Sequence, residues 1–235
     1  MADTPEGTPE VPKSWLRRRL ESALRRGFLE AYETIKVDPE RYLMQMRAAY
    51  GVPASTYQGI FSVSLPQLDA IAIDVIRSSM RIAAAEGAGL GLGGFLTLLP
   101  DLGILSAITL RTIQKLSLTY GFEFNTEAET AELWMAAASA AGVDLSRELV
   151  EKGVVRQFVP RVIQRIAVQT SKDMAEKWAG RLVPVLSGVI GGGLNYYFVR
   201  VWGERAMRHF RERHRELRAT GGELEFQPIH AETRS

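Results

Sequence analysis

The sequence predicts an all-α protein: a single compact multi-helix bundle of about seven to nine helices, with two glycine-rich apolar helical hairpins. Three observations predict this class. Apolar residues recur at spacings of three and four along most of the chain, and alternating strand patterns are nearly absent. Two long segments, residues 87–110 and 182–199, contain many glycines and almost no charge. With 235 residues, the chain is long enough to bury a core without disulfides.

One helical domain is predicted over residues 13–218, between two tails, residues 1–12 and 219–235, that lack helical periodicity. The chain is 46% apolar and 24% charged, which is the balance of a folded globular protein. Its acidic, proline-bearing start, MADTPEGTPEVP, shows no secretory signal, so we expect a cytoplasmic protein. The absence of cysteine excludes disulfides, thiolate nucleophiles and cysteine-ligated metal sites.

An amphipathic basic helix is predicted over residues 15–35. One face carries apolar side chains at helical spacing: Leu16, Leu20, Leu24, Phe28 and Ala31. Residues 13–26 also contain six basic residues against one acidic residue. The candidate membrane or partner contacts on this helix are Trp15, Arg17, Arg18, Arg19, Arg25 and Arg26. Such a helix suits anionic lipid headgroups, although a solvated basic face explains the same pattern.

The first uncharged segment, residues 87–110, contains a single charge, Asp101, directly after Pro100. Because proline disrupts a helix, two helical arms are expected to meet near residues 99–101. Asp101 is then expected to cap the N-terminus of the second arm, which continues to Gly121.

Four further helices are expected. They run from Pro66 to Gly87, from Thr126 to Gly142, from 162 to 182 with Pro160 at the entrance, and over the arginine-rich residues 202–217. Glu86 and Arg111 flank the first uncharged segment and are placed to meet across its hairpin as a structural ion pair.

Five glycines in the uncharged segments are candidate partner- or membrane-contact positions: Gly91, Gly93, Gly94, Gly188 and Gly192. Residues 89–94 satisfy the G-x-G-x-x-G pattern, but a predicted helix precedes them where a dinucleotide site needs a strand. No cofactor is therefore expected. Small residues let helix backbones approach closely, and a membrane-touching arm is the alternative explanation.

The second uncharged segment, residues 182–199, has three possible placements: a dry core hairpin, interfacial insertion, or a membrane span. Its Pro184, Asn195, Tyr196 and Tyr197 argue against a simple span. Arg200, at its end, is either a snorkelling arginine at a lipid interface or an ordinary surface residue.

No catalytic residue and no metal ligand are predicted. The three histidines, His209, His214 and His230, lie in the basic end or the tail, outside the expected core. The net charge of +2 and the pI of 8.9 argue against a nucleic-acid partner. Pro100, Asp101 and Arg111 are interpreted as structural residues.

The paired segments nevertheless carry a family resemblance. The runs GLGGFLTLLPD (91–101), LRTIQ (110–114), YGF (120–122) and PVLSGVIGGGLNYYF (184–198) resemble the EcsC family of bacterial proteins, most strongly over residues 65–215. The family takes its name from a gene that accompanies an ABC transporter, and no settled activity comes with it. The resemblance implies a bacterial, α-helical, membrane-proximal protein and supplies no catalytic residues.

The leading functional hypothesis is a non-catalytic cytoplasmic protein that associates with the inner membrane face as an accessory or adaptor. Its expected partners are an anionic membrane surface, a membrane protein, or both, and self-association stays open. One alternative is a wholly soluble interaction module whose apolar hairpins are its core. Another is an enzyme or binder that acts on a lipid or small molecule.

Overall fold

The computed structural model describes residues 13–90, 95–145, 155–178 and 187–220. Within those ranges the chain forms eight helices and no strand, which confirms the all-α prediction. The helices are α1 (Lys13–Thr34), α2 (Pro39–Tyr50), α3 (Tyr57–Ile60), α4 (Leu65–Leu90), α5 (Phe95–Thr119), α6 (Glu127–Ala140), α7 (Val155–Trp178) and α8 (Ser187–Ala219).

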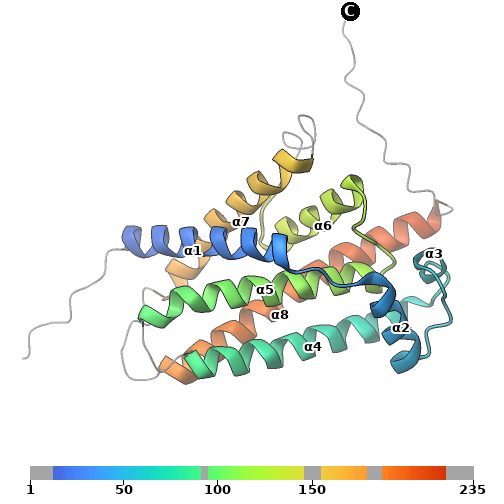
Figure 1. Cartoon of the computed structure of the whole chain (residues 1–235), viewed down its shortest axis with the longest axis horizontal. Coiled ribbons are helices and arrows are strands. Elements are labelled where there is room, and N and C mark those ends of the chain that lie inside the picture. Colours follow the sequence, from blue (N-terminus) through green and yellow to red (C-terminus); the bar gives the residue numbers. More distant parts are fainter. Residues whose placement is uncertain (1–12, 91–94, 146–154, 179–186, 221–235) are drawn as a thin grey trace, which may run out of the picture.

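The long helices lie side by side along one axis of an elongated bundle (Figure 1). Helix α4 runs antiparallel to both α5 and α8, and α4 with α8 forms the most extensive pair. Helix α1 packs on another side of α5, α7 packs on α1, and α6 packs between α7 and α8. The short helices α2 and α3 lie at the end of the bundle where α4 begins.

The apolar face of α1 is part of the protein core. Leu20, Leu24 and Phe28 have no exposed surface, and Leu16 and Ala31 are nearly as buried. Phe28 stacks on Trp202 of α8 with ring centroids 5.6 Å apart. The predicted apolar face of this helix is therefore confirmed, and the fold itself occupies that face.

Side chains cap the starts of two helices, α6, whose start was predicted, and α2, which was not. Thr126 caps α6 by accepting from the backbone N–H of Glu129, whose carboxylate accepts from the N–H of Thr126 in return. Asp38 caps α2 by accepting from the N–H of Arg41. At the other end of α6, Gly142 adopts a positive φ of 76°, as expected for a helix stop.

The prediction that two helical arms meet at residues 99–101 was wrong. Helix α5 begins at Phe95 and continues through Pro100 and Asp101, so Asp101 is not an N-cap. Pro100 is the sixth residue of α5, where the loss of its N–H removes one hydrogen bond near the helix start. The packing of α5 against α1, α4 and α8 outweighs that local penalty.

Two other boundaries also differ from the prediction. Helix α7 starts at Val155 and contains Pro160, which was expected at its entrance. Helix α4 continues past Gly87 to Leu90. Both shifts lengthen helices at ends where local signals are weak compared with packing.

The second uncharged segment and the basic C-terminal helix form one element. From Ser187 onward the backbone is helical without interruption to Ala219. Residues 91–94 and 179–186, which belong to or adjoin the two glycine-bearing segments, fall outside the described residues. The two hairpins therefore remain predictions.

Close helix approaches occur at glycines that the sequence analysis did not select. A Cβ on Gly27 of α1 would lie 2.8 Å from Ser106 Oγ and 3.0 Å from Gly103 Cα on α5. A Cβ on Gly203 of α8 would lie 2.9 Å from Ile76 Cγ1 on α4. These contacts establish which residues of each helix pair lie opposite each other.

A polar network joins α4, α5 and α8 beside the core. Tyr120 donates its hydroxyl hydrogen to Asp69 at 2.7 Å, and Arg211 Nε lies 3.0 Å from both oxygens of the same carboxylate. Burial raises the pKa of the Tyr120 hydroxyl, and its hydrogen bond to Asp69 raises it further. Tyr120 therefore stays protonated and acts as a donor.

His214 corrects the expectation that no histidine lies in the core. Its side chain is completely buried, stacks on Phe61 with centroids 4.9 Å apart, and donates from Nδ1 to the carbonyl oxygen of Tyr120 at 2.8 Å. Within the described part of the chain, Nε2 has no hydrogen-bond partner. Because a carbonyl only accepts, Nδ1 carries the proton in the neutral ring.

Candidate functional site

The two uncharged segments and the basic helix converge at one end of the bundle. The start of α1, the end of α4, the start of α5, the end of α7 and the start of α8 all lie there (Figure 1). We call this end, as far as it is described, the uncharged end, after the two uncharged segments; it also carries charged residues, among them Glu86 of α4 and Lys172, Asp173 and Glu176 of α7. The opposite end holds α2, α3 and the C-terminal half of α8.

Contacts between helices place the arginines of α1 at the uncharged end. Gly27 lies against residues 102–106 of α5, and α1 and α5 run in the same direction. The residues that precede Gly27 therefore lie beside the beginning of α5. The five arginines predicted as contacts are all exposed: Arg17, Arg18, Arg19, Arg25 and Arg26.

The exposed arginines of α1 are not neutralised by ion pairs with described residues. Within the described ranges, no carboxylate lies within ion-pair distance of Arg17, Arg18, Arg25 or Arg26. Arg19 lies over the ring of half-buried Trp15, with Cζ 5.3 Å from its centroid. The positive charge of this face is thus available to an external anion.

On α8, three of the seven arginines pair with acidic residues of the same protein, whereas Arg205, Arg208, Arg215 and Arg218 are in no ion pair with a described residue. Arg200 pairs with Glu204 at 2.8 Å, Arg213 with Glu216 at 3.2 Å, and Arg211 with Asp69 at 3.0 Å. Arg200 is an exposed residue in a pair one turn apart, the arrangement of an ordinary surface arginine.

Apolar side chains are exposed next to the uncharged end. Ile82 of α4 is 51% exposed, Ile104 of α5 is 37% exposed, and Tyr196 and Tyr197 of α8 are 41% and 50% exposed. The first thirteen residues of α8, 187–199, contain no charged residue. The nearest acidic residue on α4 is Glu86, which is exposed.

The described residues include only two of the five glycines predicted as contact sites. Gly91, Gly93 and Gly94 lie outside the described residues. Gly188 and Gly192 are in the first turns of α8. Gly193, the next residue, has open space where a Cβ would be.

The expected ion pair between Glu86 and Arg111 is not among the ion pairs of the described residues. Glu86 lies close to the uncharged end, whereas Arg111 is the seventeenth residue of α5, about 24 Å along that helix from Phe95. Arg111 is exposed beside Lys115, whose pKa is lowered first by burial and then by the Arg111 charge.

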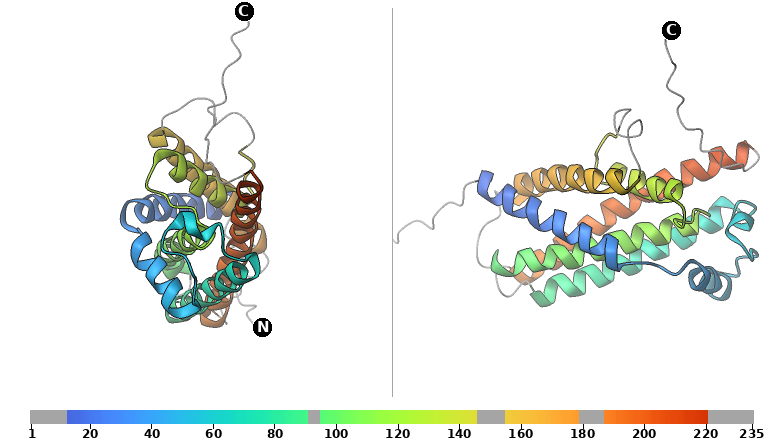
Figure 2. Two further views of the ribbon diagram at one scale, coloured as in Figure 1. Left: turned by 90° about the vertical axis from the view of Figure 1, so that its right-hand side faces the viewer. Right: turned by 45° about the horizontal axis from the view of Figure 1, so that its top comes forward.

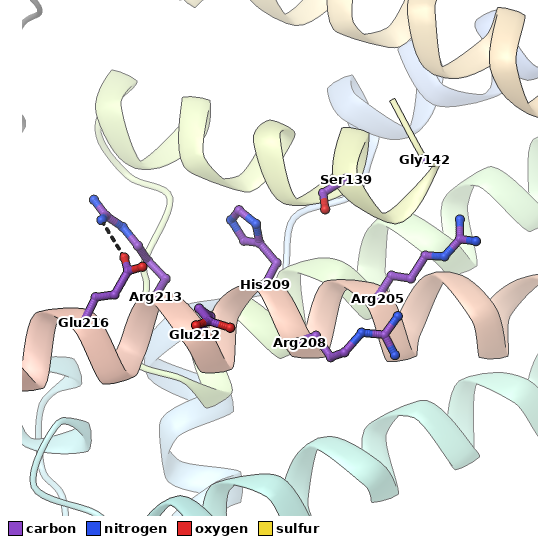
Figure 3. A pocket seen from close by; sticks show the side chains of 8 residues that line it. All are labelled: Ser139, Gly142, Arg205, Arg208, His209, Glu212, Arg213 and Glu216. Atoms are coloured by element: carbon purple, nitrogen blue, oxygen red, sulfur yellow. Dashed lines mark hydrogen bonds and ion pairs between the residues drawn. The ribbon is translucent and has the colours of Figure 1, made fainter. Parts of the chain in front are cut away.

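A second candidate site is a polar groove between the end of α6 and α8 (Figure 3). Its volume is about 590 Å³, and its lining residues are Ser139, Gly142, Arg205, Arg208, His209, Glu212, Arg213 and Glu216. Arg205 donates to the carbonyl oxygen of Ala140 at 3.1 Å. His209 Nε2 lies 2.8 Å from Glu132 Oε1.

The charges of this groove largely balance. Three arginines face two glutamates, and the Arg213–Glu216 pair already satisfies one of each. The groove therefore shows no strong preference for an anion or a cation. Among the described residues, no cluster of three or more histidine, aspartate or glutamate side chains is placed to hold a metal ion.

Sequence reasoning missed several of these features for physical reasons. The exposure of Ile82 and Ile104 depends on which neighbouring helices cover them, and helical periodicity alone does not encode that. Tyr196 and Tyr197 were noted only as an argument against a membrane span. A tyrosine pair directly after an uncharged run is a signal for an interfacial position that was available from the sequence.

Comparison with known proteins identifies the family. The model of the EcsC protein family matches residues 16–214. This chain belongs to the EcsC family. An EcsC-family relative, Protein EcsC of Bacillus subtilis (strain 168), is 25% identical over 210 residues, which cover 88% of each chain. No solved structure matches the chain significantly.

The EcsC match extends further than the resemblance in the sequence motifs. It begins at Leu16 and so includes α1, which precedes the expected region of residues 65–215. The basic helix and the two uncharged segments therefore belong to one family domain. No helix in the described ranges combines the length and apolarity needed to cross a membrane.

Proposed function

We propose that this EcsC-family protein is a non-catalytic accessory or adaptor that binds peripherally to the cytoplasmic face of an anionic membrane. One observation carries the proposal: the unpaired arginines of α1 and the exposed apolar residues of α4, α5 and α8 lie at the same end of the bundle. A bilayer surface offers anionic headgroups and apolar chains in that same combination.

The magnitude of the effect is sufficient for reversible binding. Each basic residue near an anionic surface contributes about 1 kcal/mol. Four exposed arginines, Arg17, Arg18, Arg25 and Arg26, therefore contribute about 4 kcal/mol, or roughly a thousandfold in affinity. The apolar face of α1 lies in the core and adds nothing to binding, so the apolar part must come from other exposed residues.

The test is flotation of the purified protein with vesicles that contain or lack anionic lipid. We expect flotation with anionic vesicles at low salt and little with neutral vesicles. The variant Arg17→Gln/Arg18→Gln/Arg25→Gln/Arg26→Gln should lose most of the binding.

The matched control removes the same charge from the opposite end and middle of the bundle. Arg41→Gln/Arg47→Gln/Arg208→Gln/Arg215→Gln also replaces four exposed arginines, from α2 and α8. We expect this variant to keep most of the binding, because its charges lie away from the uncharged end. Equal losses in the two variants would show that net charge, and not this end, drives the association.

Wild-type protein that fails to float with anionic vesicles at low salt would overturn the proposal. The soluble interaction module would then be the better account of the exposed residues.

A further inference from the structure

We infer that the bundle docks on the membrane end-on, with the uncharged end in the headgroup layer and α2 held away in water. This inference rests on the proposed function and adds the orientation of the bound protein. It identifies Ile82, Tyr196 and Tyr197 as the residues that enter the interface, beside the arginines at the start of α1.

The first step is the alignment of α4 with α8. Gly203 lies against Ile76, and the two helices are antiparallel. Six residues further along α4 is Ile82, and six residues earlier along α8 is Tyr197. These side chains therefore lie at one level, about 9 Å beyond the crossing toward the uncharged end. Their exposed fractions of 51% and 50% leave both accessible to a surface that approaches this end.

The second step concerns the direction of approach. Seen along its long axis, the bundle has α1 on one side and α8 on another (Figure 2). A membrane that lay flat against α1 would contact its arginines but not the tyrosines of α8. A membrane flat against α8 would do the reverse. Only at the uncharged end can one flat membrane surface contact both the arginines of α1 and the tyrosines of α8.

The third step is the division of charge along α8. This helix has 33 residues and is therefore about 50 Å long. Its first thirteen residues carry no charge, whereas residues 200–218 carry seven arginines and three glutamates. Only the N-terminal part can enter a headgroup layer without dehydrating these charges and ion pairs. Tyrosine is enriched at such interfaces because its ring is apolar and its hydroxyl is polar.

The absence of native cysteine permits a direct test of the orientation. Single cysteines at exposed positions, Ile82→Cys and Tyr196→Cys near the uncharged end and Met44→Cys on α2, are labelled with a polarity-sensitive nitrobenzoxadiazole dye. Each labelled protein is mixed with anionic vesicles with and without a nitroxide-bearing lipid. We expect a blue shift and nitroxide quenching at positions 82 and 196, and neither at position 44.

Flotation of each labelled protein separates the two possible failures. If no labelled protein floats, both the proposed function and the end-on orientation are overturned. If all three float but the dye at position 44 responds, or the dyes at 82 and 196 do not, the end-on orientation is overturned while membrane binding stands. Met44 is 59% exposed, so its label reports the solvent near α2 without disturbing the core.

Discussion

Gly27 and Gly203 allow the closest helix approaches among the described residues. The space at Gly27 is bounded by backbone atoms, Gly103 Cα and Leu102 O, which cannot move by a rotamer change. The space at Gly203 is bounded by the side chain of Ile76, which has some freedom to rearrange. The same added methyl group is therefore more disruptive at Gly27 than at Gly203.

We expect Gly27→Ala to lower the free energy of unfolding by about 1–3 kcal/mol, because the new Cβ overpacks the α1–α5 contact. Gly193→Ala is the matched control, since nothing lies within 4 Å of its Cβ position. At this helical position alanine should stabilise the protein by up to about 1 kcal/mol. Urea denaturation followed by circular dichroism measures both. If Gly27→Ala leaves the free energy of unfolding unchanged, α1 packs less closely on α5 than the structure shows.

The buried His214 makes the folding stability depend on pH. Burial lowers the pKa of His214 below its ordinary value of 6.5, and the charge of Arg218 lowers it too. The hydrogen bond to Tyr120 and the charge of Asp69 oppose this shift. The unfolded chain therefore binds a proton at a higher pH than the folded protein does, so folding stability falls as the pH drops below about 6.5.

The variant His214→Leu should separate two effects of this residue. At pH 7.5 it should be less stable than the wild type by about 1–3 kcal/mol, because the carbonyl of Tyr120 loses its partner. Between pH 7.5 and 5, however, the stability of the variant should decrease less than that of the wild type, since the titrating imidazole of His214 is gone. Urea denaturation at several pH values measures the two slopes. Parallel slopes would assign the acid sensitivity to other groups.

At the scale of elements, α1 has two faces with separate roles. Its leucines are in the core and its arginines are exposed. Leu24→Ala should cost about 2–5 kcal/mol of stability. Arg25→Gln, one residue along, should change stability by less than about 0.5 kcal/mol. Thermal denaturation compares them, and a large loss in Arg25→Gln would reveal a structural role for that arginine.

The helices also show how much the sequence could predict. The face of α1, the helix start at Thr126 and the stop at Gly142 depend on neighbours within a few residues, and all three were predicted correctly. Pro100 and Pro160 were misplaced because local rules assign them to helix ends, whereas packing extends both helices around them.

The candidate site was predictable in its parts but not in its assembly. The exposed arginines of α1 follow from periodicity alone. Their position beside the start of α5 depends on the contact of Gly27 with residues 102–106, which no local pattern encodes. The burial of His214 likewise depends on Phe61 and Tyr120, which are distant in sequence.

At the scale of the whole molecule, we expect salt to separate two contributions to membrane binding, one from the arginines and one from the apolar residues. The arginine contribution is screened as the Debye length falls to about 3 Å at 1 M salt. Binding that persists should come from the apolar residues, so Ile82→Ser/Tyr196→Ser/Tyr197→Ser should remove it. Flotation in a salt series measures this. A triple variant that matches the wild type at high salt would show that these residues do not contact lipid.

The pairing of α4 with α8 also has a consequence for synthesis. Helix α4 ends at Leu90, but its most extensive partner, α8, ends only at Ala219. A ribosome that adds about 5–20 residues per second leaves the apolar face of α4 without α8 for on the order of 10 s. During that interval Ile76, which is buried in the finished fold against Gly203, has no α8 to cover it. We therefore expect the nascent chain to bind chaperones until its last helix emerges.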